Sequence, residues 1–370
     1  MLRYRSKVLL YYAEISVKNI MGLGKQWSNS YFGVKEHLNP KVIPKYKNKL
    51  IKPYIYQPIL TGTPSTEYER IYFIDICRFK HQILPEGFPK TSVIGYRSLV
   101  KVSEGGGTKY LRSYPGGIFE EIRGIPTHMI WRNKTDTPVN MCIHTGRNSY
   151  PDILYESDNR NKEVYHLYLN NREPAMYRYY DQNSSVGLNS LYIINEDKKY
   201  NRFALNMMDL PAAKYEYPII IQDCSFYKDG SFDFTQSYGD AVMVNGKVWP
   251  SLDVERRQYR FIILNGSSSR YYNLMLSNDI KFTVIGRGKG MLTSSINQSK
   301  LHLAPGEKAD VLIDFSRLTA GTSIYMTTVD KTGRGEESPN HDTREEIMRF
   351  DIPENSAIAI RPIKLPNKLI

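Results

Sequence analysis

The stretch from Val242 to Leu276, VMVNGKVWPSLDVERRQYRFIILNGSSSRYYNLML, decides the fold of this chain. It consists of short apolar runs separated by turn-forming sequences, such as Asn265-Gly266 and the Ser-Asn-Asp triplet that follows at 277–279. Runs this short and evenly spaced are typical of β-sandwiches and not of a parallel α/β sheet. The stretch therefore predicts an all-β fold.

The same pattern of short apolar runs and turn-forming sequences begins near residue 69 and continues to about residue 353. In GIPTHMIWRN, Met129 and Trp131 share one face of the expected strand, whereas His128 and Arg132 share the other. This region divides into two blocks near MMDLPAAKYEYP (207–218). The sequence thus predicts one β-sandwich over residues 67–212, a second over 213–353, and a C-terminal tail over 354–370.

Residues 1–66 form a basic arm in front of these blocks. Residues 1–60 contain eleven lysine and arginine residues and two acidic ones, a net charge of +9, whereas the remaining 310 residues carry +3. Apolar residues at roughly helical spacing predict an amphipathic helix over 1–23. Residues 24–66 contain a proline every few positions, which favours an extended strap lying on its own domains or on a partner.

The charge of the arm predicts contact with a polyanion. An extended strap would present five lysines to successive phosphates and three tyrosines to unpaired bases: Lys41, Lys45, Lys47, Lys49, Lys52, Tyr46, Tyr54 and Tyr56. A solvated basic linker is the alternative. The turn GRGKG at 286–290 lacks the spacing of a phosphate loop, although its basic residues also suit a phosphate contact.

The blocks resemble the first two cupredoxin domains of multicopper oxidases, in particular spore-coat laccases and bilirubin oxidases. The resemblance is carried by five stretches: SYPGGIFEEIRGIPTHMIWRN (113–133), YPIIIQDCSFYKDGSF (217–232), the stretch from Val242 to Leu276, LHLAPGEKADVLIDFS (301–316) and EEIMRFDI (345–352). It implies two Greek-key cupredoxin sandwiches, copper bound by His-x-His pairs, and a third domain with an electron-entry copper. Residues i and i+2 of a strand share a face, which is why such pairs converge on neighbouring metals.

The ligand positions implied by the resemblance are mostly changed. Cys142-Ile143-His144 occupies the first pair, and Tyr180-Asp181-Gln182 occupies the second. No His-Cys-His triplet occurs, and the chain ends where a third domain would begin. A two-ligand metal site at Cys142 and His144 is the alternative to a vestigial one. We therefore expect Cys142, His144, Tyr180 and Gln182 to be vestigial positions, with no catalytic residue, no bound metal or cofactor and no small-molecule substrate.

These changes predict a non-catalytic relative recruited as an architectural subunit of a large assembly. The basic, acid-poor start suggests a mitochondrial address, and the basic arm suggests RNA, so the mitochondrial ribosome is the first expectation. An accessory subunit of a respiratory complex, with helix 1–23 on a membrane surface, is an alternative. A further alternative is a reduced, laccase-like copper oxidase that completes its site with another subunit.

Overall fold

The computed structural model describes most of the chain after the N-terminal arm. The described residues are 35–61, 69–101, 107–137, 139, 141–144, 164–181, 188–196, 210–211, 213–235, 238–288, 290–328, 345–356, 359–367 and 369. One compact unit runs from His37 to Ile370. The helix expected over 1–23 and the strap's first residues, 24–34, lie outside the described part.

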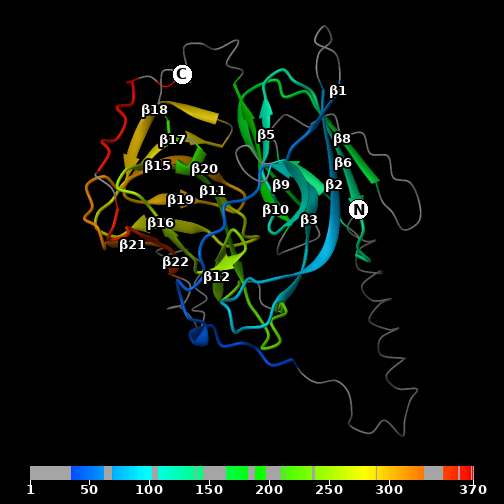
Figure 1. Ribbon diagram of the computed structural model, residues 1–370, viewed down its shortest axis with the longest axis horizontal. Coiled ribbons are helices and arrows are strands. Elements are labelled where there is room, and N and C mark those ends of the chain that lie inside the picture. Colours follow the sequence, from blue (N-terminus) through cyan, green and yellow to red (C-terminus); the bar gives the residue numbers. More distant parts are fainter. Residues whose placement is uncertain are drawn as a thin grey trace, which may run out of the picture. The chain divides into compact units, whose positions relative to one another are not determined.

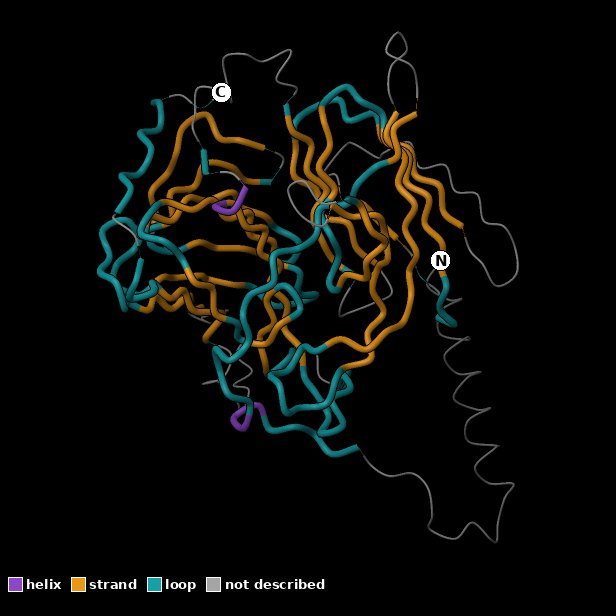
Figure 2. Tube along the Cα trace, viewed as in Figure 1, coloured by secondary structure: helices purple, strands orange, loops and turns teal. Residues whose placement is uncertain are grey.

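The first block forms two sheets (Figures 1 and 2). A six-stranded sheet has the order β4-β3-β2-β6-β8, with β1 added on β2, and a four-stranded sheet has the order β5-β10-β9-β7. The strands are β1 (Ile59–Thr61), β2 (Glu69–His81), β3 (Thr91–Lys101), β4 (Thr108–Ser113), β5 (Phe119–Ile122), β6 (Thr127–Asn133), β7 (Met141–His144), β8 (Val164–Leu169), β9 (Ala175–Asp181) and β10 (Asn189–Asn195).

The second block also forms two sheets. Their orders are β13-β12-β11-β15-β20-β17-β18 and β14-β22-β21-β16-β19. The strands are β11 (Glu216–Cys224), β12 (Ala241–Val244), β13 (Lys247–Val248), β14 (Ser251–Asp253), β15 (Gln258–Asn265), β16 (Tyr272–Leu276), β17 (Phe282–Arg287), β18 (Gly290–Gln298), β19 (Leu301–Leu303), β20 (Lys308–Asp314), β21 (Ser323–Thr328) and β22 (Glu346–Asp351). The described helices are the 3₁₀ turns η1 (Pro40–Val42) and η2 (Ala213–Tyr215), and none of the described helices is long and apolar enough to cross a bilayer.

Each pair of sheets encloses an apolar core, so the predicted all-β sandwich architecture is confirmed. Along β6 the exposure alternates as expected, with Met129 and Trp131 buried and His128 and Arg132 partly exposed. The Trp131 ring packs on three other aromatic rings of the core, those of Tyr96, Phe119 and Tyr179, at centroid distances of 5.5–5.9 Å. The alternation of apolar residues in this strand therefore places the centre of the first core.

The strap lies on its own chain and contributes to both cores (blue in Figure 1). Leu38, Ile43 and Leu50 are buried in the second core, and Tyr56 is buried in the first. Backbone hydrogen bonds hold it along its length, including Leu50 N–H to the Ser251 carbonyl at 2.7 Å. The strap is therefore part of the folded body, which is the first of the two surfaces expected for it.

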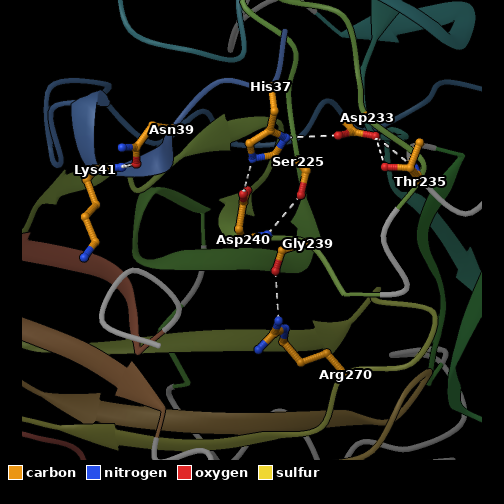
Figure 3. Close-up of polar contacts among 9 residues, drawn as sticks. All are labelled: His37, Asn39, Lys41, Ser225, Asp233, Thr235, Gly239, Asp240 and Arg270. Carbon is orange, nitrogen blue, oxygen red and sulfur yellow. Dashed lines mark hydrogen bonds and ion pairs between the residues drawn. The ribbon is translucent and has the colours of Figure 1, made fainter. Parts of the chain in front are cut away.

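His37 anchors the start of the strap between two buried carboxylates (Figure 3). Its Nδ1 lies 3.0 Å from Oδ2 of Asp233, and its Nε2 lies 2.8 Å from Oδ2 of Asp240. Burial disfavours the charged imidazole, but the hydrogen bonds and charges of the two aspartates outweigh this and raise the pKa of His37. Burial also disfavours the charged form of Asp233 and so would raise its pKa, but hydrogen bonds from Thr235 and His37 lower this pKa to about 2.

This anchor predicts a pH-dependent contribution to stability. Because the folded pKa of His37 is raised above its ordinary value of 6.5, its contribution is complete below that value and disappears as the pH rises through the folded pKa. We expect His37→Gln to lower the free energy of unfolding more at about pH 5 than at about pH 9. Urea unfolding of both proteins at the two pH values measures this. His302→Gln is the control, since that exposed histidine contacts Asn273 and no carboxylate; an equal loss at both pH values would contradict the prediction.

Candidate functional site

The two segments expected to carry vestigial copper-ligand positions are adjacent strands. The strand β7 pairs antiparallel with β9 at the edge of the four-stranded sheet, and this register places Cys142 opposite Tyr180 and His144 opposite Arg178. Cys142 and Tyr180 are both partly exposed. The structure thus brings these positions together, although Gln182 and the side chain of His144 lie outside its described part.

The surroundings of Tyr180 favour an anion and not a metal cation. The Arg178 guanidinium lies over the Tyr180 ring, 4.3 Å from its centroid, and its Nε donates to Oδ1 of Asn189 at 2.5 Å. Burial lowers the pKa of Arg178 to about 10, which still leaves it charged at neutral pH. A fixed positive charge beside the ligand positions opposes the binding of a cation.

The donors that the structure describes here do not fit a copper cluster. A copper site of the family type needs several imidazoles, whereas Cys142 offers one thiol and Tyr180 a phenol. Within the described residues, no group of three or more histidine, cysteine, aspartate or glutamate side chains is placed to hold a metal ion. No catalytic step through copper can be derived from these residues.

Three lysines of the predicted RNA contact face the protein. Lys45 pairs with Glu346 and lies over the Trp249 ring. The ammonium of Lys49 lies 2.6 Å from Oδ1 of Asp253, and Lys52 lies over the ring of Tyr217. These lysines therefore contribute to intramolecular contacts in the fold.

The other predicted contact residues divide between the surface and the interior. Lys41, Lys47 and Tyr54 are exposed. Tyr46 packs against Tyr325 and Arg349, and Tyr56 is buried, donating or accepting a hydrogen bond with Ser113 at 2.7 Å. The structure does not gather the eight residues into one surface, and an RNA contact through the exposed ones stays a prediction.

Comparison with known proteins finds similarity to multicopper oxidases. It is 28% identical over 353 residues to a laccase of Bacillus subtilis, covering 84% of this chain and 66% of the laccase. It is 23% identical to a bilirubin oxidase of Albifimbria verrucaria, covering 85% of this chain and 55% of that enzyme. A multicopper oxidase of Aquifex aeolicus superposes with a TM-score of 0.66, and its 2F4 variant with 0.68; both are 21% identical, covering 87% of this chain and 68% of that chain. No family model matches. The chain therefore spans about two thirds of the laccase's length.

These relatives correct one expectation. The altered ligand positions led us to expect a protein that is not an enzyme, and this is contradicted, because the relatives are named laccase and bilirubin oxidase and the structural neighbours are multicopper oxidases. Changed ligand positions in a scaffold that is otherwise similar to oxidases are not enough to exclude an enzyme. The chain is a multicopper oxidase-like protein built from cupredoxin-like β-sandwiches.

Proposed function

We propose that this chain works in a laccase-like oxidase whose copper is held by another polypeptide segment or subunit. The observation that carries the proposal is the 28% identity to a laccase across 84% of this chain. The strands β7 and β9, on which the resemblance places copper ligands, remain paired here although their described donors do not suit copper. The role of this chain is then to position the copper-bearing part.

The place for that part is the edge of the four-stranded sheet. Among the described strands, β7 has β9 as its neighbour and forms one end of the sheet, so a further segment would pair with its other edge. Cys142 is partly exposed there. A neighbouring domain at this edge would lie beside Tyr180 and Arg178.

Copper analysis of native and recombinant protein tests the proposal. We expect the complex isolated from its source to contain stoichiometric copper and to oxidise 2,6-dimethoxyphenol, because the copper-bearing part is present. The recombinant chain alone, loaded with copper and desalted, should do neither. A native complex without copper and without phenol oxidation would contradict the proposal, as would stoichiometric copper on the chain alone.

We also propose that the oxidase belongs to a larger assembly, which the charge of +9 in residues 1–60 supports. The mitochondrial ribosome and a respiratory complex are the two assemblies considered, with RNA or a membrane surface as the respective contact. Sedimentation of the native protein before and after RNase treatment distinguishes them. Release from a particle by RNase supports the ribosome, whereas release by detergent alone supports the respiratory complex, and a protein that sediments alone contradicts both.

A further inference from the structure

The two sandwiches meet at a small apolar interface with a polar region at each end. Its apolar centre consists of residues from both blocks: Ile118, Met176, Leu191, Ile193, Ile220, Ile262 and Leu264. In β9 and β10, Arg178 lies directly opposite Leu191, two cross-strand pairs from Met176 and Ile193 and therefore on the same face of the sheet. In β15 and β20, Lys308 lies directly opposite Leu264. Arg178 of the first sandwich and Lys308 of the second therefore lie at the same end of the apolar centre, on opposite sides of the interface.

At one end the buried charges are balanced. Arg260 in β15 forms ion pairs with Asp310 at 2.6 Å and with Glu216 at 2.8 Å. These bonds, working against the burial of the guanidinium, raise its pKa. This end of the interface satisfies the rule that buried charges are paired.

At the other end the charges are not balanced. Lys308 is 6% exposed, and its neighbouring charges are Arg178 and the exposed Glu307. Burial and the Arg178 charge lower the pKa of Lys308 to about 8. Within the part of the chain that the structure describes, neither Lys308 nor Arg178 forms an ion pair with a carboxylate. Two neighbouring buried cations without an ion-paired carboxylate destabilise the interface unless an anion lies between them.

The backbone leaves room for the Arg178 guanidinium at this end. A Cβ on Gly306, two residues before Lys308, would lie 3.2 Å from Nη1 of Arg178. Gly306 also has a φ of +79°, a conformation that favours glycine. The Nη atoms of Arg178 find no acceptor among the described residues, because its described hydrogen bond uses Nε. The fork of the guanidinium is therefore available for bidentate binding.

A second polar side chain at the same end of the interface also lacks a partner among the described residues. Gln222 follows Ile220 on the interface face of β11 and is 1% exposed. Neither its Nε2 nor its Oε1 has a hydrogen-bond partner among the described residues. Its Cγ lies next to Gly266, whose carbonyl accepts from Nδ2 of Asn189, the residue that also accepts from Arg178. A buried amide without partners indicates a missing polar group.

We propose that the end of the domain interface formed by Arg178, Lys308 and Gln222 binds a small oxyanion, a phosphate or carboxylate group. Its oxygens accept hydrogen bonds from the Nη atoms of Arg178 and from the Lys308 ammonium, and the amide of Gln222 donates to it. The anion neutralises two cations that face each other across the two sandwiches and so holds the domains together. This site does not depend on copper, and it stands or fails separately from the oxidase proposal.

Thermal unfolding of the full chain with inorganic phosphate, against chloride at equal ionic strength, tests the site. Ligand that binds only the folded state raises the Tm. We expect saturating phosphate to raise the Tm of the wild type by about 3 °C or more. Lys308→Met and Arg178→Met should lose this rise, and Lys308→Met should be the more stable protein in chloride because it removes a cation without a partner. Lys47→Met, at an exposed lysine outside the interface, is the matched control and should keep the full rise.

The outcomes are distinct. A phosphate-dependent rise that Lys308→Met and Lys308→Gln both retain overturns the proposal, as does the absence of any rise in the wild type with phosphate, sulfate and succinate alike. A larger rise with succinate than with phosphate identifies a carboxylate as the ligand and supports the site. Isothermal titration calorimetry with phosphate gives a second readout, in which the heat of binding should disappear in Arg178→Gln.

Discussion

Truncation of residues 1–57 is expected to prevent stable folding of the body. It removes Leu38, Ile43 and Leu50 from the second core and Tyr56 from the first. Replacing one buried leucine or isoleucine by alanine lowers the free energy of unfolding by roughly 2–5 kcal/mol. Because the whole free energy of unfolding of a domain is only about 5–15 kcal/mol, the loss of all four side chains exceeds what a domain can tolerate. Far-UV circular dichroism and the Tm of the purified fragment measure the effect.

A shorter truncation is the matched control for the strap. Removal of residues 1–36 ends before His37 and keeps every strap contact described above, so it should leave the Tm of the body unchanged. If the protein lacking residues 1–57 unfolds at the same temperature as the one lacking 1–36, the strap is dispensable and this account of it is wrong.

Trp131→Ala is expected to lower the free energy of unfolding by about 3–5 kcal/mol. The ring is 1% exposed and packs on Tyr96, Phe119 and Tyr179, so its removal leaves a cavity in the first core. Its Nε1 has no hydrogen-bond partner among the described residues, so Trp131→Phe should cost much less. Urea unfolding measures all three proteins.

The next residue on the same strand provides the control. Ile130 points to the opposite face of β6 and is partly exposed, so Ile130→Ala should cost less than Trp131→Ala. A loss of stability for Trp131→Ala no larger than that for Ile130→Ala would contradict the burial of this face.

Periodicity and resemblance predicted the sandwiches, but they could not predict where the strap lies. The alternation around Trp131 is visible in the sequence because a strand with one buried face must alternate. In the strap, Leu38, Ile43, Leu50 and Tyr56 follow no period, since proline excludes a helix or a regular strand there. Their burial depends on surfaces that exist only once both sandwiches have formed.

The candidate sites show the same limit. The resemblance assigned copper-ligand positions to Cys142-x-His144 and to Tyr180-x-Gln182, and the structure pairs the strand of Cys142 with the strand of Tyr180. The polar residues at the domain interface were not predicted, although Lys308 begins the mostly apolar strand β20 and Gln222 directly follows three isoleucines. A single polar residue in such a run indicates an unusual environment but not which distant residue faces it.

The path of the strap also constrains the order in which the molecule is completed during synthesis. Lys45 pairs with Glu346 and Tyr46 packs on Arg349, so this part of the strap leaves the ribosome some 300 residues before these partners. Domains commonly fold as they emerge, N-terminal first. Here the contacts of Lys45 and Tyr46 with β22 cannot form until β22 has been translated. The apolar strap residues that pack in the second core must therefore stay exposed, or be covered by a chaperone, until the second sandwich has been translated.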